Sequence, residues 1–265
     1  MIERIAHPTD FSSEGTASFS HALRLAVEFR CRLDLLHVRS PNSQDNWDSF
    51  PHVRETLARW GLLASDASIN DMEAQLGVSV RKVEISHQDA VGGVSTFLLT
   101  HRPDLVVLAT HGPTGLIRWF SGSVSESIAK QTHIPTLFLG PNARPFVDQQ
   151  SGALGLNNLV VPLARNPSPR RALHTLNVLL DPLKPYIHAF HIGDTAPWIL
   201  DQAGEPLDVK LRQGPVVETI LDAAQSADLI AMPTDGRHGF LDALRGSTTE
   251  RVLHQADCPL LALPA

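Results

Sequence analysis

The stretch from Leu105 to Glu126 reads LVVLATHGPTGLIRWFSGSVSE, and it decides the fold of the chain. It opens on a continuous apolar run, Leu105 to Ala109, of the length and β-branched content typical of a strand buried on both faces. It ends on Ser123 to Glu126, a capping box that predicts the start of a helix. Gly112 and Gly122 lie between strand and helix, where glycine lets the backbone approach an anion and the helix start offers free amides. The stretch therefore predicts a strand, a loop that fits a phosphate, and a helix.

A second stretch, Leu229 to Glu250, repeats this layout as LIAMPTDGRHGFLDALRGSTTE. One glycine followed by serine at a helix start is more often plain capping than a ligand site, but a repeated layout is stronger. The landmarks are related by a constant offset of 124: Asp104 to Asp228, Gly112 to Gly236, Gly122 to Gly246, Glu126 to Glu250 and Pro135 to Pro259. We interpret the chain as a duplicated module.

The two loops resemble those of the universal stress proteins, here as a tandem two-domain member. Nucleotide-binding members of that family carry Gly-x2-Gly-x9-Gly-(Ser/Thr) after the fourth strand. The first copy reads Ala109-x2-Gly112-x9-Gly122-Ser123, and the second reads Pro233-x2-Gly236-x9-Gly246-Ser247. Both copies lack the first glycine. Alanine still allows a close approach, whereas Pro233 removes an amide and fixes φ, so the second loop is a poorer ligand site.

The first copy opens with a strand, Glu3 to Pro8, then Thr9-Asp10, a helix over about Ser13 to Phe29, and a strand from Arg32 to Val38. On spacing alone, Asp10 is better explained as an ordinary turn or cap carboxylate. The resemblance implies instead that Asp10 meets the adenine end of a nucleotide and that Val38 lines the base pocket. It implies a site made of Pro8, Thr9, Asp10, Val38, Ala109, Thr110, His111, Gly112, Gly122, Ser123, Val124 and Ser125. The corresponding degenerate candidates of the second copy are Gly236, Gly246, Ser247 and Thr248.

The opening of the second copy follows a different offset, 154, which relates Pro8 to Pro162, His37 to His191 and Val38 to Ile192. Because the offsets 154 and 124 differ by 30, the second copy lacks residues between its second and fourth strands. The first copy has there a helical pattern, Val53 to Leu76, and a strand, Val78 to Ile85. The second copy keeps only a short Pro197-Trp198-Ile199-Leu200 turn and a strand from Leu207 to Arg212. We expect a thinner helical cover and an apolar patch there. The position of Asp10 is taken by Ala164, which again weakens the second site.

Composition narrows the function classes. A formal net charge of −6 over 265 residues argues against a general nucleic-acid coat, which needs a basic face. No run of eighteen apolar residues occurs and the N-terminus reads as a strand, so we expect a cytoplasmic protein without membrane partners. Cys31 and Cys258 are expected to be buried thiols, and the 13 histidines form no spacing typical of a metal site.

The expected fold class is α/β, with two tandem universal-stress-protein-like domains at residues 1–142 and 157–265. Each is expected to be an open, five-stranded, mainly parallel sheet with helices on both faces. The resemblance adds the strand order 3-2-1-4-5. The polar, turn-rich segment from Pro141 to Asn158 is interpreted as the domain linker.

Three classes of function remain open at this point. The favoured one is a stress-response or signalling protein that binds ATP or a related adenine nucleotide in its first domain, with or without Mg²⁺. The second is a structural or partner-binding module in which the glycines only permit tight turns. An enzyme is the weakest, because no Gly-x4-Gly-Lys-(Ser/Thr) loop is present and no catalytic residue is assigned, although slow ATP hydrolysis stays open.

The last strands predict how the two copies meet. Pro135 to Gly140 (PTLFLG) and Pro259 to Pro264 (PLLALP) are both apolar, and an apolar strand edge invites pairing. Tandem linkage raises the effective concentration of one copy for the other. We expect Thr136–Leu139 and Leu260–Leu263 to pair in antiparallel fashion around a pseudo-two-fold axis, and the thinly covered second copy to offer a surface for a homodimer.

Overall fold

The computed structural model describes residues 2–12, 15–39, 47–110, 134–140, 142–165, 168–200, 204–234 and 248–264. The first half contains β1 (Arg4–Pro8), α1 (Gly15–Phe29), β2 (Arg32–Arg39), the 3-10 turn η1 (Trp47–Ser49), α2 (Val53–Arg59), α3 (Ile69–Leu76), β3 (Ser79–Ser86), α4 (Ala90–His101), β4 (Leu105–Ala109) and β5 (Thr136–Leu139). The second half contains β6 (Asn158–Pro162), α6 (Arg170–Leu180), β7 (Tyr186–Ile192), β8 (Lys210–Arg212), α7 (Val216–Ala224), β9 (Leu229–Thr234), α9 (Thr248–Gln255) and β10 (Leu260–Pro264).

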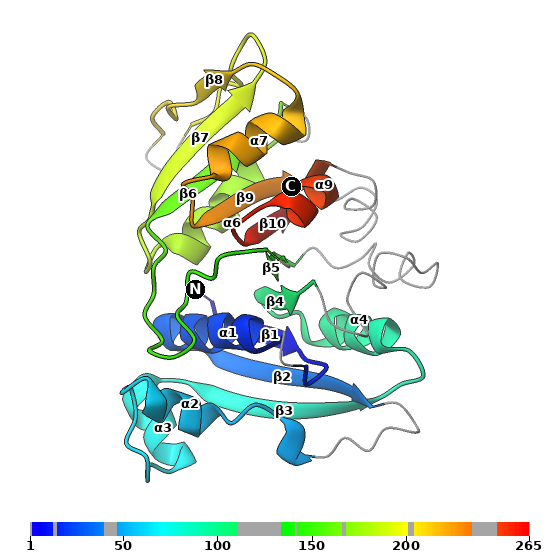
Figure 1. Ribbon diagram of the computed structural model, residues 1–265, viewed down its shortest axis with the longest axis vertical. Helices are drawn as coiled ribbons and strands as arrows, with labels where there is room; N and C mark the ends of the chain where they lie inside the picture. The colour runs from blue at the N-terminus through cyan, green and yellow to red at the C-terminus, as the bar shows by residue number, and fades with distance from the viewer. Residues whose placement is uncertain are drawn as a thin grey trace.

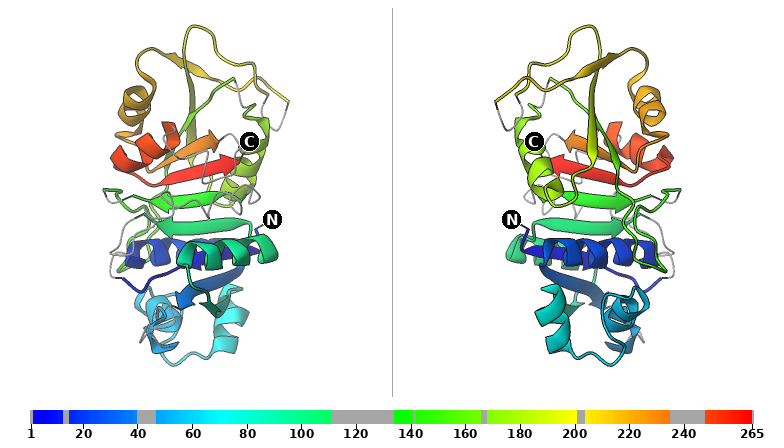
Figure 2. Two further views of the ribbon diagram at one scale, coloured as in Figure 1. Left: turned by 90° about the vertical axis from the view of Figure 1, so that its right-hand side faces the viewer. Right: turned by 90° about the vertical axis from the view of Figure 1, so that its left-hand side faces the viewer.

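The ten strands within the described residues form one sheet in the order β3-β2-β1-β4-β5-β10-β9-β6-β7-β8. Within each half the strands are parallel, and both halves have the predicted order 3-2-1-4-5. Helices lie on both faces of the sheet, as the two side views in Figure 2 show. The expected α/β fold is confirmed.

The two halves join through their last strands. β5 and β10 pair in antiparallel fashion, with Leu137 opposite Leu261 and Phe138 opposite Leu260. Figure 1 shows this junction at the middle of the molecule, with the first half on one side and the second half on the other. The predicted interdomain pairing is therefore confirmed, and each half covers the open edge of the other.

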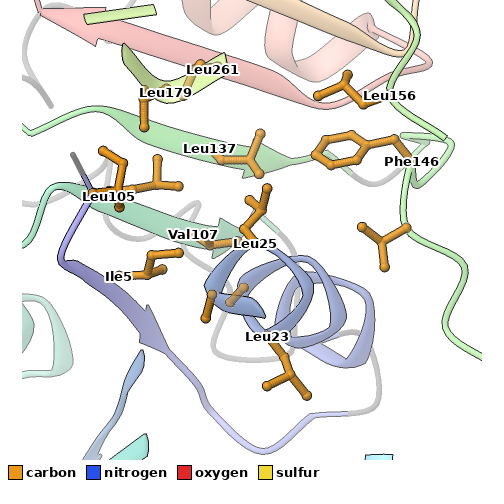
Figure 3. Close-up of a cluster of buried hydrophobic side chains, with 14 of the residues drawn as sticks. Ile5, Leu23, Leu25, Leu105, Val107, Leu137, Phe146, Leu156, Leu179 and Leu261 are labelled. Carbon is orange, nitrogen blue, oxygen red and sulfur yellow. The ribbon is translucent and has the colours of Figure 1, made fainter. Parts of the chain in front are cut away.

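A single apolar cluster crosses the junction. On one face of the sheet, Leu105 of β4 and Leu137 of β5 lie with Leu179 of α6 and Leu261 of β10 in one buried group (Figure 3). Figure 3 also shows Phe146 and Leu156, from the segment between the halves, directed into this group. The core is thus shared, and burial of these side chains stabilises the arrangement of the halves as well as each half.

The connecting segment, residues 142–157, differs from the polar joint expected for the linker. Phe146 and Val147 are buried, and a β-bridge joins Val147 to Leu154. Asp148 closes the turn between them by accepting hydrogen bonds from the backbone amides of Gln150 (3.1 Å) and Ser151 (2.7 Å). The segment is a folded part of the protein with its own buried side chains.

This hairpin-like segment is held by both halves. The unprotonated Nε2 of His21, on α1, accepts from the backbone amides of Phe146 (3.1 Å) and Val147 (3.2 Å). The Trp60 indole donates to the carbonyl of Gln149 at 3.1 Å. At the other end, the Arg144 guanidinium donates to the carbonyl of Gln225 at 2.8 Å. These contacts limit how far one half can turn relative to the other.

Two further expectations differ in detail. The helical pattern from Val53 to Leu76 forms two helices, α2 and α3, because the chain turns at Gly61, which has φ of 70°. Of the expected strand from Leu207 to Arg212, only Lys210–Arg212 forms a strand, β8, which pairs with the end of β7. The second half is therefore even less complete at its outer edge than its sequence suggests.

Candidate functional site

Those residues of the predicted nucleotide site that the structure describes lie at the carboxyl ends of the central strands of the first half. β1 pairs with β2 on one side and with β4 on the other, so strand order reverses between β1 and β4. Open α/β sheets place ligands at such a switch point. Pro8 ends β1, Val38 is near the end of β2, and Ala109 ends β4.

The turn after β1 holds the carboxylate of Asp10 in a defined position. The amide of Thr9 donates to the carbonyl of Leu36 at 2.8 Å, which continues the strand pairing by one residue. Asp10 Oδ1 then accepts from the amide of Ser12 at 3.0 Å, and Thr9 Oγ1 accepts from the amide of Phe11 at 3.1 Å. Phe11 has φ of 62°, the left-handed conformation that this turn requires. Asp10 is exposed, and the Ser12 hydroxyl also donates to its Oδ1 at 2.5 Å, so the carboxylate is held in a defined orientation at the surface.

Three further residues of the predicted site are described: Val38 and Ala109 provide apolar surface, and Thr110 fixes the end of β4. Val38 and Ala109 are partly buried, each leaving some apolar surface. Thr110 is buried, and both its amide (3.0 Å) and its hydroxyl (3.2 Å) donate to the carbonyl of Leu139 on β5. Thr110 therefore anchors the end of β4, from which the glycine loop departs.

Most of the predicted phosphate loop lies outside the described residues. This applies to His111, Gly112, Gly122, Ser123, Val124 and Ser125 in the first half, and to Gly236, Gly246 and Ser247 in the second half. Thr248 is described and is the first residue of α9. The loop residues stay predictions from the sequence.

Two histidines of the first half lie beneath the turn that carries Asp10. Neither was predicted as a site residue from the sequence. His7 Nδ1 donates to the carbonyl of Val107 at 3.0 Å, and its Nε2 meets no hydrogen-bond partner among the described residues. Burial lowers the pKa of His7 to about 4, although the hydrogen bond to Val107 and the charge of Asp10 oppose the shift. His7 is therefore neutral at pH 7. A histidine within an otherwise apolar strand was the signal available in the sequence.

The second histidine is part of an aromatic group. His37 Nδ1 donates to the carbonyl of Thr9 at 3.0 Å, and its ring stacks on Phe11 at 3.9 Å between centroids. Phe50 packs edge-on against Phe11 at 5.1 Å. These three rings pack together beneath the turn that carries Asp10 and support it. Phe11 and Phe50 come from separate parts of the chain, so the sequence pattern gave no indication that they meet.

At the corresponding edge of the second half, the supporting hydrogen bonds are present, but the carboxylate that would face a ligand is absent. His191 Nδ1 donates to the carbonyl of Leu163 at 2.7 Å, as His37 does to Thr9. Thr234 donates to Leu263 at 3.3 Å, as Thr110 does to Leu139. However, Ala164 has no carboxylate where the first half has Asp10.

Both cysteines of the chain are among the described residues. Cys31 and Cys258 are buried free thiols, as predicted, and burial raises the pKa of each to about 12. Within the described ranges, no three histidine, cysteine or acidic side chains gather in a way that would hold a metal ion. None of the described helices is long and apolar enough to cross a bilayer.

Comparisons with known proteins agree with this fold. The profile described as the universal stress protein family matches residues 1–139 and 172–264. A curated universal stress protein of Methanocaldococcus jannaschii is 27% identical over 143 residues, which cover 52% of this chain and 81% of that protein.

Solved structures match nearly the whole chain. A universal stress protein from Archaeoglobus fulgidus superposes with a TM-score of 0.63 and 16% identity, covering 98% of this chain and 96% of its own. A functionally unknown protein from Pseudomonas aeruginosa gives a TM-score of 0.61 at 15% identity, with 99% and 92% covered. At these identities the structures establish the shared fold, including the tandem arrangement. The chain belongs to the universal stress protein family and carries two of its domains in tandem.

Proposed function

We propose that this stress-family protein binds ATP, or a related adenine nucleotide, in its first domain only. The observation that carries the proposal is the gathering of Asp10, Val38 and Ala109 at the switch point between β1 and β4. The oriented carboxylate of Asp10 can accept from hydroxyl or amino groups of a nucleoside. Val38 and Ala109 offer partly exposed apolar surface for a base.

The phosphates would rest on the loop that begins at His111. Gly112 and the Gly122-Ser123 pair would bring backbone amides to the phosphate oxygens, and the capping box would place a helix N-terminus there. Mg²⁺, where it accompanies the nucleotide, would be held mainly by the phosphates, since this ion keeps several waters and few protein ligands. No step of hydrolysis is assigned to any residue of the chain.

Variants of equivalent glycines test the proposal. Gly122→Val should abolish ATP binding, because a side chain at this position takes the space of a phosphate oxygen. Gly246→Val changes the equivalent position of the second domain and should leave ATP affinity unchanged. Calorimetric titration of both variants, with circular dichroism to compare their folding, gives the result. Equal affinity for ATP in the two variants would contradict the proposal.

The alternative is a partner-binding tandem module, and one observation favours a self-association role beside nucleotide binding. Large apolar side chains are exposed on the outer part of the second domain: Tyr186, Ile187, Trp198, Leu200 and Leu211. We propose that this surface joins two chains into a homodimer. Light scattering coupled to gel filtration should show a dimer that Trp198→Glu converts to a monomer, whereas a wild-type monomer at all concentrations would refute it.

The division at residues 1–142 and 157–265 remains our proposal for the domain boundaries. The buried Phe146 and Leu156 of the connecting segment imply that neither fragment alone covers the shared core. The cytoplasm is the proposed location of the protein.

A further inference from the structure

A pocket of about 260 Å³ opens on the face of the second domain that α7 covers. It lies between β7, β8 and the last turn of α7. Figure 1 shows these three elements at one end of the molecule. We call it the cationic pocket and define it by Asn158, His188, Phe190, Lys210 and Arg212. Among the described residues that line it, none is an aspartate or a glutamate.

The pocket exists because β8 is short. In the first half, β3 pairs with the whole of β2, from Arg32 to Arg39. In the second half, β8 pairs only with Phe190 to Ile192, the last three residues of β7. The beginning of β7 therefore has no outer neighbour among the described strands, and the side chain of His188 is exposed.

The charges of this face differ between the two halves. Position 188 corresponds, by the offset of 154, to Asp34, which is fully buried in the first half. There the Asp34 carboxylate pairs with the guanidinium groups of Arg32 (2.8 Å), Arg81 (3.3 Å) and Arg4 (3.7 Å). In the first half, the Asp34 carboxylate therefore balances the positive charge of these three arginines. The second half has His188 at that position and no carboxylate in the pocket.

Lys210 and Arg212 take positions that are apolar in the first half. The strand register equates them with Val83 and Ile85, which pack against the apolar cluster under α4. Residues two apart in a strand share a face, so both cations lie on the side of the sheet that α7 covers. The Arg212 guanidinium lies 5.3 Å from the centroid of the Phe190 ring, which holds it in place over an aromatic floor.

We propose that the cationic pocket binds a small phosphorylated compound, with Lys210, Arg212 and His188 around the phosphate and with Phe190 holding the Arg212 guanidinium in place. Ammonium and guanidinium groups form charge-assisted hydrogen bonds to phosphate oxygens. The volume of about 260 Å³ suits a phosphate group with a small organic part and is below that of drug-sized ligand pockets. Asn158 begins β6 and Ala227 precedes β9, so one side of the pocket lies at the amino ends of these strands, and the pocket belongs to the domain that is not proposed to bind ATP. The proposal is independent of nucleotide binding by the first domain.

The test is a titration of the full chain with pyrophosphate, followed by amide NMR shifts at constant ionic strength. The shifts of residues 188, 190, 210 and 212 should saturate, and Lys210→Gln should weaken the affinity read from them by about tenfold or more. Arg212→Gln should act likewise, but it also uncovers Phe190, so Lys210→Gln is the decisive variant.

The matched control is the double variant Arg170→Gln, Lys184→Gln, which removes two exposed cations of the same domain outside the pocket. It should leave the affinity at the pocket unchanged. Shifts that do not saturate would overturn the proposal. An affinity that falls as much in the control as in Lys210→Gln would also overturn it, because the effect would then be one of general charge.

Discussion

The two domains keep the same internal supports and differ in the groups that face a ligand. In the first, Asp104 Oδ2 accepts from the amides of Glu3 and Arg4, both at 2.9 Å. In the second, Asp228 Oδ2 accepts from the amides of Asn157 and Asn158, both at 2.8 Å. These bonds tie β4 to β1 and β9 to β6 in the same way. A polar contact that closes the sheet is present in both copies, while Ala164 and His188 stand in the second copy at the positions of Asp10 and Asp34.

This comparison indicates a division of roles within a single sheet. The first domain has the more complete cover and the candidate nucleotide edge, whereas the second has a shortened outer edge, exposed apolar side chains and the cationic pocket. The antiparallel pairing of β5 with β10 makes the two depend on each other for their common core.

The largest expected effect comes from breaking the junction. Leu261→Asp places a carboxylate in the shared core, where Leu261 is 4% exposed and pairs with Leu137. It should lower the free energy of unfolding by about 4 kcal/mol or more, because the charge has no partner there. It should also speed proteolysis near Gln149, whose carbonyl is held by Trp60. Denaturant unfolding and limited proteolysis measure both effects.

The control for the junction is Ile69→Asp, a similar change at an exposed position of α3 in the first domain. It should alter the free energy of unfolding by less than about 1 kcal/mol. If Leu261→Asp leaves domain packing and cleavage unchanged, the final strands do not hold the two domains together.

A smaller effect is expected from the contact between α1 and the connecting segment. His21→Leu removes the acceptor of two buried amides, those of Phe146 and Val147, and should cost about 2 to 4 kcal/mol of unfolding free energy. Thr175 is the equivalent position of α6, and Thr175→Leu serves as the control with little expected change. Similar stabilities of the two variants in chemical denaturation would show that His21 does not anchor the segment.

The smallest effect at neutral pH should come from His7→Val, which gives the first domain the residue of the second, Val161. Burial lowers the pKa of His7 from 6.5 to about 4, so the unfolded chain binds the proton more readily between these values. The stability that the neutral His7 contributes is complete above pH 6.5 and is lost as the pH falls toward 4. His7→Val should therefore change stability little at pH 7 and protect the protein against acid.

The measurement is the difference in unfolding free energy between wild type and His7→Val across pH 4 to 7. As the pH falls through this range, the unfolding free energy of the variant should rise relative to that of the wild type by up to about 3 kcal/mol. His21, whose pKa is also about 4, is unchanged in both proteins and cancels in the difference. A difference independent of pH would mean that His7 has an ordinary pKa in the folded protein.

The sequence predicted the elements that have strong local signals. The apolar runs at Leu105 and Leu229 are strands, and the apolar last strands pair across the duplication as expected. These features could be read from the chain because apolar β-branched runs and tandem repetition each limit the possible folds strongly.

Other features depend on contacts between distant residues. The connecting segment has the composition of a joint, yet Phe146 and Val147 are buried by α1 and held by His21. The cationic pocket arises where β8 begins late and leaves the start of β7 without an outer neighbour among the described strands, which depends on the packing around these strands. For the candidate nucleotide site, the sequence identified Asp10 and the glycine pattern, but not the rings of Phe11 and His37 that support the turn.

The most direct test of the account is the number of ATP molecules bound per chain, measured by isothermal calorimetry on the nucleotide-free protein. We predict about one site per chain, because the first domain has Asp10 and Ala109 where the second has Ala164 and Pro233. Two equal sites, or no binding, would contradict the proposed difference between the domains.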